Sequence, residues 1–249
     1  MDGDNPEGGS VDSSEEPDRD TTTTVTVVVP VYNEADYLGG AIPKLVDELT
    51  PVPAEVTILV VENGSIDDSA AIVRSMMTEY RQLHLIQLPE ANYGAAIRAG
   101  FSEAETDWVV VFDIDYFSGS FLTAAMERRD EADLVIGSKR MPDSDDRRSF
   151  VRRSATWLLN TILRLTLGLQ VSDTHGIKAI RRTVLDAVLP DVVSVDDLFD
   201  TEVVLRAERL GKRIVELPVV VEEQRESRSR IWNRVPRTLV GIIRIRRAL

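Results

Sequence analysis

Apolar runs of two kinds alternate along the chain, and this alternation constrains the fold more than any other feature. Five short runs rich in β-branched residues predict strands over 25–31, 56–61, 83–88, 108–114 and 132–138. Between the first four, apolar residues recur at helical spacing over 38–49, 72–80 and 97–104. Strands alternating with helices predict an α/β fold, in which one domain holds a doubly wound, mostly parallel sheet flanked by helices.

Polar residues follow the first four predicted strands. The segments are PVYNE at 30–34, ENGSIDDS at 62–69, NYGAA at 92–96 and FDID at 112–115. Taken singly, such residues often only cap a helix, as we predict for Asn92. In a parallel sheet, however, all four segments reach the edge where ligands bind. None of them matches GxGxxG or GxxxxGK[ST], which disfavours a nicotinamide enzyme or a P-loop NTPase.

Composition limits the cofactors and partners. The chain has no cysteine and only two histidines, so disulfides and thiolate sites are excluded and a zinc site is disfavoured. A metal would have to be a hard cation bound by carboxylates, and Asp113 and Asp115 are the natural candidates. The net charge of −13 argues against a nucleic-acid partner. No apolar run is long enough to span a bilayer, and the first residues do not resemble a signal peptide.

The two ends of the chain differ from its middle. Residues 1–22 are acidic and poor in large apolar side chains, which predicts a disordered tail. Residues 23–230 contain the strand and helix pattern and form the predicted domain. Residues 231–249 mix apolar residues with arginines and predict a basic amphipathic segment.

The polar motifs together resemble glycosyltransferase family 2, whose members have the GT-A fold. The motifs that carry this resemblance are PVYNE, VENGSIDDS, NYGAAIRAG and FDID. Further motifs resemble the branch that glycosylates polyprenyl or dolichyl phosphate with mannose or glucose. They are VIGSKR (135–140), DTHGIKAI (173–180), FDTE (199–202), RIVELPV (213–219) and RESRSRIW (225–232).

The resemblance implies roles for individual residues. Asp113 and Asp115 would hold Mg²⁺ or Mn²⁺ against the diphosphate of a nucleotide sugar, and Asp197 and Arg230 complete the predicted catalytic set. Ser229 and Arg230 stand where the family has a Ser-Lys pair that contacts phosphate. The predicted donor-binding residues are Pro30, Tyr32, Glu34, Glu62, Asn92, Gly94 and Ser229.

Three positions depart from the family pattern. Glu62 replaces an aspartate, which lengthens the reach towards the nucleotide by one methylene. Phe117 stands where many relatives have a glutamine that helps to bind the metal, so we expect fewer protein ligands here. Ser227 replaces a glycine of the late loop.

The predicted function is that of an inverting glycosyltransferase. It would move a hexose from a UDP- or GDP-sugar to polyprenyl or dolichyl phosphate, as a peripheral protein on the cytoplasmic face of the cell membrane. A phosphate monoester has a second pKa of about 6, so the acceptor oxygen needs no obligatory general base. The four acids Asp173, Asp197, Asp200 and Glu202 would then orient sugar hydroxyls or hold the loop.

Three alternatives remain at this point. One is a family 2 transferase that elongates a lipid-linked or soluble glycan, and another is a nucleotide-sugar binder without catalysis. The third is a haloacid-dehalogenase-like phosphatase, in which Asp113 would be the nucleophile. Against the phosphatase, Phe117 occupies its Thr/Val position and three strand–helix units precede the motif.

Two amphipathic stretches bear on the acceptor. An apolar stripe runs from Val151 through Leu158 and Leu165 to Leu169, beside Trp157. It fits a core-packed helix and a membrane-facing helix equally well. For 231–249 we expect contact with an anionic membrane surface, and a closing helix on the core is the alternative.

Overall fold

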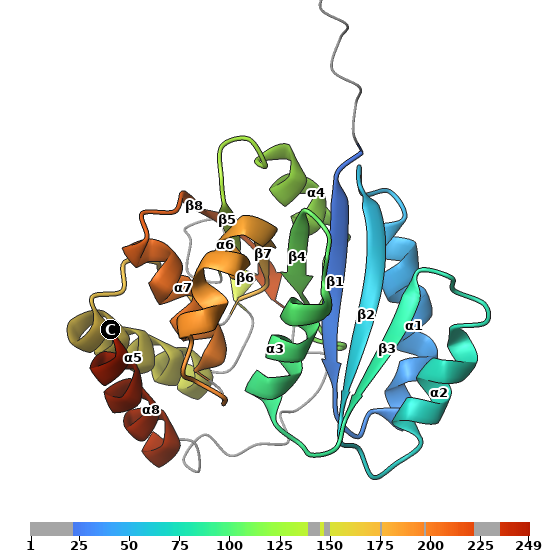
Figure 1. Ribbon diagram of the computed structural model, residues 1–249, viewed down its shortest axis with the longest axis horizontal. Helices are drawn as coiled ribbons and strands as arrows, with labels where there is room; N and C mark the ends of the chain where they lie inside the picture. The colour runs from blue at the N-terminus through green and yellow to red at the C-terminus, as the bar shows by residue number, and fades with distance from the viewer. Residues whose placement is uncertain (1–21, 139–144, 147–149, 175, 197, 222–234) are drawn as a thin grey trace, which may run out of the picture.

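The computed structural model describes residues 22–138, 145–146, 150–174, 176–196, 198–221 and 235–249. Its centre is a seven-stranded sheet with the order β3-β2-β1-β4-β7-β5-β8 (Figure 1). The strands are β1 (Thr24–Val31), β2 (Glu55–Asn63), β3 (Leu83–Leu88), β4 (Trp108–Val111), β5 (Leu134–Ser138), β7 (Lys178–Arg181) and β8 (Ile214–Pro218). Two short strands, β6 (Asp145–Asp146) and β9 (Val220–Val221), pair separately.

The sheet is mostly parallel, as predicted. β1 pairs in parallel with β2 and β4, β2 with β3, and β5 with β8. β7 runs antiparallel between β4 and β5, and neither β7 nor β8 was among the predicted strands. The carboxyl ends of β1, β2, β3 and β4 therefore meet at one edge of the sheet.

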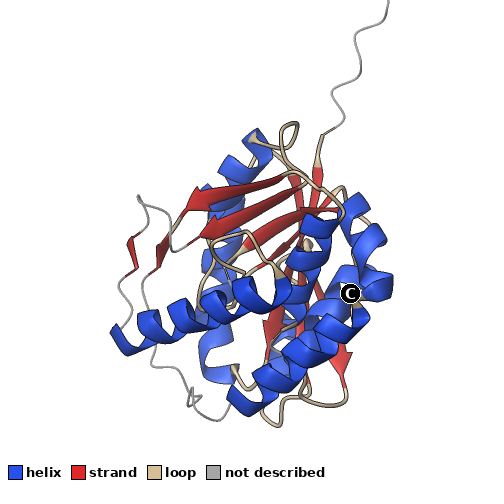
Figure 2. Ribbon diagram, turned by 90° about the vertical axis from the view of Figure 1, so that its left-hand side faces the viewer, coloured by secondary structure: helices blue, strands red, loops and turns tan. Residues whose placement is uncertain are grey.

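Helices cover both faces of the sheet (Figure 2). On one face lie α1 (Ala35–Leu49), α2 (Ser69–Met76) and α4 (Gly119–Glu127). On the other lie α3 (Tyr93–Glu103), α5 (Phe150–Leu167), α6 (Arg182–Val188), α7 (Phe199–Arg209) and α8 (Val235–Ala248). A 3₁₀ turn, Leu189–Asp191, follows α6.

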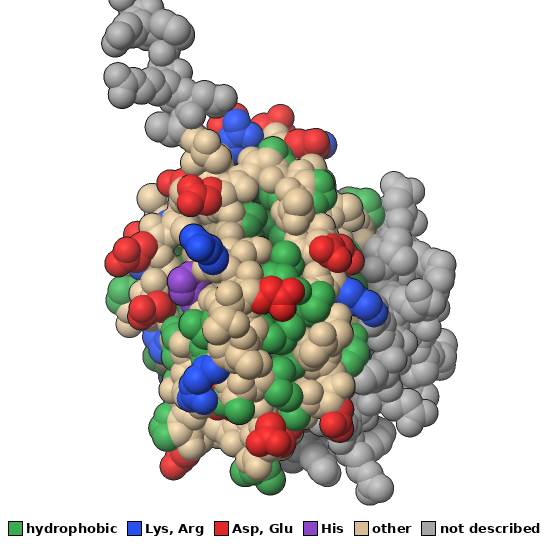
Figure 3. All heavy atoms as spheres, turned by 90° about the vertical axis from the view of Figure 1, so that its right-hand side faces the viewer, with side chains coloured by type: hydrophobic (Ala, Val, Ile, Leu, Met, Phe, Trp, Pro, Cys, Tyr) green, Lys and Arg blue, Asp and Glu red, His purple; other side chains and the backbone are tan. Residues whose placement is uncertain are grey.

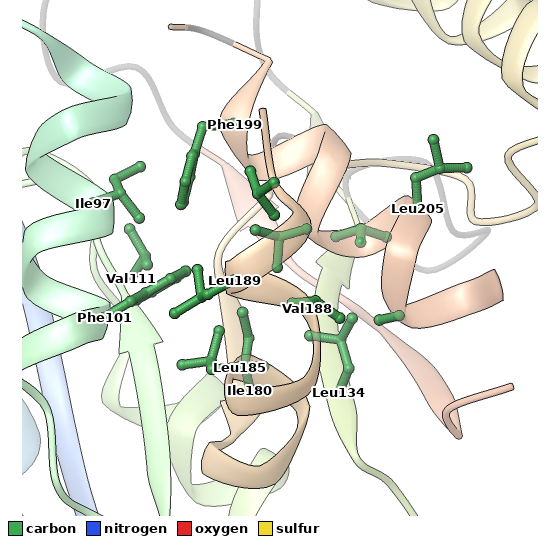
Figure 4. Packing of buried hydrophobic residues seen from close by; sticks show 14 of the residues in the cluster. Ile97, Phe101, Val111, Leu134, Ile180, Leu185, Val188, Leu189, Phe199 and Leu205 are labelled. Carbon is green, nitrogen blue, oxygen red and sulfur yellow. The ribbon is translucent and has the colours of Figure 1, made fainter. Parts of the chain in front are cut away.

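Strand alternation divides the core into two layers. In β1, Val25, Val27 and Val29 pack under α1, whereas Val28 belongs to the layer under α3. In that second layer, Phe101 of α3 meets Phe199 of α7, with their ring centroids 6.0 Å apart (Figure 4). This contact joins the C-terminal half of α3 to the start of α7.

Among the described residues, none of the helices combines the length and apolar character needed to cross a membrane. The face on which α1, α2 and β3 lie shows acidic and basic side chains interspersed among apolar and neutral ones (Figure 3). This mixed surface contrasts with α8, whose last turn carries Arg246 and Arg247.

Candidate active site

The loops that follow β1 and β2 are joined by side-chain hydrogen bonds. Asn33 accepts a bond from the amide of Ile66 on its Oδ1 (2.9 Å), and its own amide donates to Ser65 Oγ (2.9 Å). The amide of Glu34 donates to Ser69 Oγ at 2.9 Å. Asn33 has a φ of 54°, a left-handed conformation that asparagine tolerates better than most residues. These contacts fix the two loops against each other.

Asp67 acts as a structural acceptor in the same junction. Its carboxylate accepts bonds from the amide of Ala35 (3.1 Å) and from the amide and hydroxyl of Ser69 (3.0 and 2.6 Å). Burial acts to raise the pKa of Asp67, but the bonds from Ser69 and Ala35 outweigh it and the pKa lies below its usual value. Asp67 thus stabilises the starts of α1 and α2.

Glu62 lies beside the end of β1, because it pairs with Val31 in the sheet register. Its side chain is buried, at 3% exposure. Oε1 accepts a short bond of 2.5 Å from the amide of Ser65, and Oε2 receives a longer one of 3.4 Å from Gln87, which Arg74 contacts in turn. A carboxylate oxygen offers two acceptor sites, so Oε2 retains capacity for a further donor.

The other predicted residues of the first strand end lie next to Glu62. Tyr32 is 45% exposed, although large aromatic rings are usually buried. Pro30 and Glu34 are half-buried on either side of it. An aromatic ring in this position can stack on a nucleobase, since every base presents an apolar face.

The loop after β3 is tied to the same edge. Asn63 Oδ1 accepts a bond of 2.7 Å from the amide of Asn92. Asn92 Oδ1 in turn accepts one of 3.1 Å from the amide of Ala95, which confirms Asn92 as the N-cap of α3. Gly94 lies in the first turn of that helix and is buried.

The two aspartates follow β4, which ends at Val111 rather than at residue 114 as predicted. Phe112 is fully buried and Ile114 is 4% exposed, whereas Asp113 is exposed and Asp115 half-buried. The amide of Tyr116 donates to the carbonyl of Asp113 at 3.0 Å and closes the turn. Alternation between buried apolar and outward acidic residues thus presents both carboxylates at the end of β4.

This pair suits a magnesium or manganese ion that also binds phosphate. Mg²⁺ is commonly bound by one or two carboxylates, with water and substrate phosphates completing its shell. Within the part of the chain that the structure describes, no group of three or more His, Cys, Asp or Glu could hold a metal. Phe117 packs against the apolar core, and its hydrocarbon ring has no donor atom to offer a metal.

The acidic residues of the second half have structural partners. Asp200 forms a buried ion pair with Lys178, whose Nζ lies 3.1 Å from Oδ1, and joins α7 to β7. Lys178 pairs with Val111 in the sheet, so this ion pair stands beside the end of β4. Thr174 and Thr201 bond through their hydroxyls at 3.0 Å. The sequence pattern assigned no role to Lys178.

Glu202 is fully buried and bonded to the backbone before α7. Of the two roles considered for it, holding the loop therefore agrees with the structure. Asp197, Ser229 and Arg230 lie outside the described residues, as does the predicted acidic tail up to residue 21. The structure thus brings together Pro30, Tyr32, Glu34, Glu62, Asn92, Gly94, Asp113 and Asp115 at one edge of the sheet.

Comparison with known families decides the assignment. The model of glycosyl transferase family 2 matches residues 26–189, which include all the described strand-end motifs. The chain belongs to glycosyl transferase family 2. This membership confirms the resemblance seen in the sequence, and it argues against the phosphatase alternative.

Curated relatives of this family 2 chain include an undecaprenyl-phosphate 4-deoxy-4-formamido-L-arabinose transferase of Klebsiella pneumoniae. It is 31% identical over 206 residues, which make up 80% of this chain and 60% of the relative. Glycosyltransferase AglD of Haloferax volcanii is 31% identical over 202 residues, or 78% of this chain and 32% of AglD. The chain thus spans less than two thirds of the relatives' own length.

Solved structures show the same fold. Glucosyl-3-phosphoglycerate synthase from Mycobacterium tuberculosis, crystallised with Mn²⁺, UDP and glucosyl-3-phosphoglycerate, superposes with a TM-score of 0.61. The match covers 90% of this chain and 78% of that one, at 18% identity. TarS of S. aureus, solved with UDP-GlcNAc, gives a TM-score of 0.56 at 19% identity, covering 89% of this chain and 67% of TarS. The predicted GT-A fold is confirmed.

Proposed function

We propose that this family 2 chain is an inverting glycosyltransferase that moves a hexose from a UDP- or GDP-sugar to the phosphate of polyprenyl or dolichyl phosphate. The observation that carries the proposal is the aspartate pair, Asp113 and Asp115, set at the same sheet edge as the joined loops after β1 and β2. The relatives named as undecaprenyl-phosphate transferases support the choice of acceptor.

The donor half of the site would lie over the ends of β1 and β2. Tyr32 offers an exposed ring for the base, and Oε2 of Glu62 can accept a bond from the base or ribose. Asn92 and Gly94 would border the nucleotide from the start of α3. Because Glu62 is already bonded to Ser65, it needs no reorganisation to act as an acceptor.

Asp113 and Asp115 would hold a divalent cation, which would neutralise the charge that develops on the departing diphosphate. The buried Phe112 and Ile114 keep the two carboxylates on the outer side of the turn. Their own charge also makes the pair a poor place for the diphosphate unless a cation intervenes. We therefore propose that transfer requires Mg²⁺ or Mn²⁺.

The acceptor half needs little proton chemistry. A phosphate monoester near neutral pH is largely dianionic, so its oxygen attacks the sugar carbon directly while the bond to the diphosphate breaks. The products are a hexosyl lipid phosphate and a nucleoside diphosphate, and no proton has to be removed. Ser229, Arg230 and Asp197 remain proposed partners of the phosphates or the sugar.

Helices α5 and α8 supply the surface that we assign to the membrane. They pack together, and α8 buries Ile242 and Ile245 in the core. Six large apolar side chains on the two helices are nonetheless about half exposed or more: Trp157, Leu158, Leu165, Leu239, Val240 and Ile243. Arg164, Arg244, Arg246 and Arg247 are exposed on the same two helices.

An anionic membrane fits this combination, because basic residues beside exposed apolar ones are typical of helices that lie in the interface. On a chain of net charge −13, such a local basic surface gives a specific direction of approach to the lipid. We place the contact on the cytoplasmic face, the side on which we expect the nucleotide-sugar donor.

Transfer is tested by incubating the chain with radiolabelled UDP- and GDP-hexoses, with and without undecaprenyl or dolichyl phosphate. We expect a labelled lipid phosphate only when donor, lipid phosphate and Mg²⁺ or Mn²⁺ are all present. Label passing instead to a lipid-linked or soluble sugar would favour the glycan-elongating alternative. Tight nucleotide binding without any turnover would favour the non-catalytic binder.

Membrane contact is tested with Arg244→Gln/Arg246→Gln/Arg247→Gln in co-sedimentation with phosphatidylglycerol vesicles. Near a surface each arginine contributes about 1 kcal/mol, so the partition coefficient should fall about a hundredfold. A charge-matched control is Lys44→Gln/Arg81→Gln/Arg128→Gln, three exposed cations on or next to helices of the opposite face. Equal losses in both variants would reject the α5–α8 surface.

A further inference from the structure

Residues 189–196, which we call the connecting segment, follow α6 and lead towards α7, and they are hydrogen-bonded to α3. Arg98 of α3 donates from Nη1 to the carbonyl of Leu189 (3.2 Å) and from Nη2 to the carbonyl of Val192 (2.5 Å). Its guanidinium also lies 5.2 Å from the ring centroid of Phe199. A planar guanidinium that meets two carbonyls and a ring fixes both the position and the tilt of the backbone it holds.

Glu202 of α7 binds the next two residues of the connecting segment, Val193 and Ser194. Its carboxylate accepts bonds from the amide of Val193 (3.0 and 3.1 Å) and from the amide of Ser194 (2.7 Å). Arg206, one turn later on the helix, donates from Nε to Oε1 at 2.8 Å. Glu202 is fully buried, so it cannot reach a sugar, and its charge is used entirely within the fold.

Two glycines set how closely the connecting segment approaches its neighbours. A Cβ on Gly94 would lie 2.5 Å from the carbonyl carbon of Val195 and 2.7 Å from the amide nitrogen of Asp196. A Cβ on Gly241 of α8 would lie 2.6 Å from the Leu198 side chain and 4.0 Å from a carboxylate oxygen of Asp196. The segment therefore lies between the start of α3, at the donor edge, and the helix α8.

We infer that Arg98 and Glu202 are positioning residues for the transfer reaction, an inference that rests on the proposed function. Together with Gly94 they hold the Val195–Asp196 peptide at a fixed distance from the start of α3, beside the donor site. The half-buried Asp196 is thereby placed at the edge where sugar and acceptor must meet. Neither Arg98 nor Glu202 touches a reactant, so their effect is on the chemical step and not on nucleotide affinity.

Gly94→Ala tests how closely the connecting segment must approach the start of α3. Carbon atoms in contact stay about 3.5 Å apart, so the new methyl must displace the Val195–Asp196 backbone by roughly 1 Å. A displacement of that size near a reacting centre costs on the order of a hundredfold in rate. We expect turnover at saturating donor to fall at least about tenfold, a larger factor than any change in the UDP dissociation constant that follows from the place of Gly94 beside the nucleotide.

Two glycine controls separate this effect from ordinary destabilisation. Gly40→Ala, on α1, meets nothing within 4 Å and should leave turnover unchanged. Gly100→Ala lies on α3 itself and its methyl would clash with the Val28 side chain, so it should lower the melting temperature without a specific loss of turnover in the folded fraction. Loss of UDP affinity in Gly94→Ala with turnover at saturating donor retained would show that Gly94 acts only on donor binding, and it would overturn the inference.

Glu202→Gln tests the hydrogen bonds from Val193 and Ser194 to Glu202. Glu208→Gln, on the same helix, is the matched control. Glu208 accepts bonds from the amides of Gln170 and Val171, so it holds a different loop in the same way. Glu202→Gln should lower turnover and accelerate hydrogen exchange at Val193 and Ser194, whereas Glu208→Gln should accelerate exchange only at its own loop.

The exchange readout does not depend on catalysis. If the native chain shows no transfer with any donor and acceptor, the proposed function fails. Hydrogen exchange at 193–194 still tests whether Glu202 holds these residues. If the native chain is active and Glu202→Gln matches Glu208→Gln in turnover, the positioning role is wrong. Unchanged exchange at 193–194 in Glu202→Gln would equally overturn it.

Discussion

Asn33 provides a test of how the two donor loops are held together. It is the only non-glycine residue of the described part with a positive φ, at 54°, and its Oδ1 accepts the amide of Ile66 at 2.9 Å. Replacing it with alanine removes that hydrogen bond, worth about 1 kcal/mol. A Cβ-bearing residue without a polar side chain also costs about 1 kcal/mol in the left-handed region. Asn33→Ala should therefore destabilise the fold by about 2 kcal/mol.

Two further substitutions separate the two contributions. Asn33→Gly keeps the conformation accessible and loses only the hydrogen bond, so it should cost about 1 kcal/mol plus a little backbone entropy. Asn33→Asp keeps both the acceptor and the tolerance for positive φ, and it should stay within about 0.5 kcal/mol of the native chain. We therefore expect Asn33→Asp to be the most stable variant, Asn33→Gly the next and Asn33→Ala the least stable.

Urea unfolding measures this order, and UDP binding measures its consequence for the site. With a slope of about 2 kcal/mol/M, the midpoint of Asn33→Ala should fall by about 1 M. If the loosened loops must be re-formed on binding, 1 kcal/mol of that cost appears as a roughly fivefold weaker UDP affinity. Equal midpoints for Asn33→Ala and Asn33→Gly would show that backbone conformation contributes nothing. If Asn33→Gly unfolds at the same urea concentration as the native chain, the hydrogen bond contributes nothing to stability.

Three other predictions follow from the same geometry. Asp115→Asn should retain the melting temperature and lose about two orders of magnitude or more in turnover, and EDTA should have the same effect; full activity in EDTA would reject the metal site. Glu62→Ala should raise the donor KM more than it lowers kcat, because contacts with base and ribose persist in the transition state, and an unchanged KM would remove Glu62 from the site. The hydrogen bond from Arg213 lowers the pKa of Asp133 to about 2, against the opposing effect of burial. Asp133→Asn should therefore cost about 1 kcal/mol at pH 7, a difference that shrinks as the pH falls from about 4 to about 2 in urea titrations; a difference independent of pH would contradict this origin.

The part of the fold that could be predicted is the part written in local patterns. The run 83–88 became β3 with the same bounds, and Asn92 became the N-cap of α3, because hydrophobic periodicity and capping depend on neighbouring residues. The strand ends then had to share one edge, because β1, β2, β3 and β4 are parallel neighbours. Convergence of Tyr32, Glu62 and Asp113 follows from topology alone.

What could not be predicted depends on contacts between distant segments. β7 is only four residues long, Lys178–Arg181, and its antiparallel place between β4 and β5 is set by pairing that no short window contains. The ion pair of Lys178 with Asp200 and the bonds of Glu202 to Val193 and Ser194 likewise follow from the packing of α7. The FDTE sequence shows that acids are present there, but not which of them turn inwards.

The basic helix at the end of the chain shows why periodicity left two interpretations open. A core-packed helix and a membrane-facing helix both place apolar residues three and four apart, so the pattern is the same for either partner. In α8 both faces are apolar: Ile242 and Ile245 enter the core, while Leu239, Val240 and Ile243 remain about half exposed. Deleting the helix would remove both contributions together and would confuse loss of the fold with loss of lipid contact. Only substitutions confined to its outer side, such as those of the arginines, can separate them.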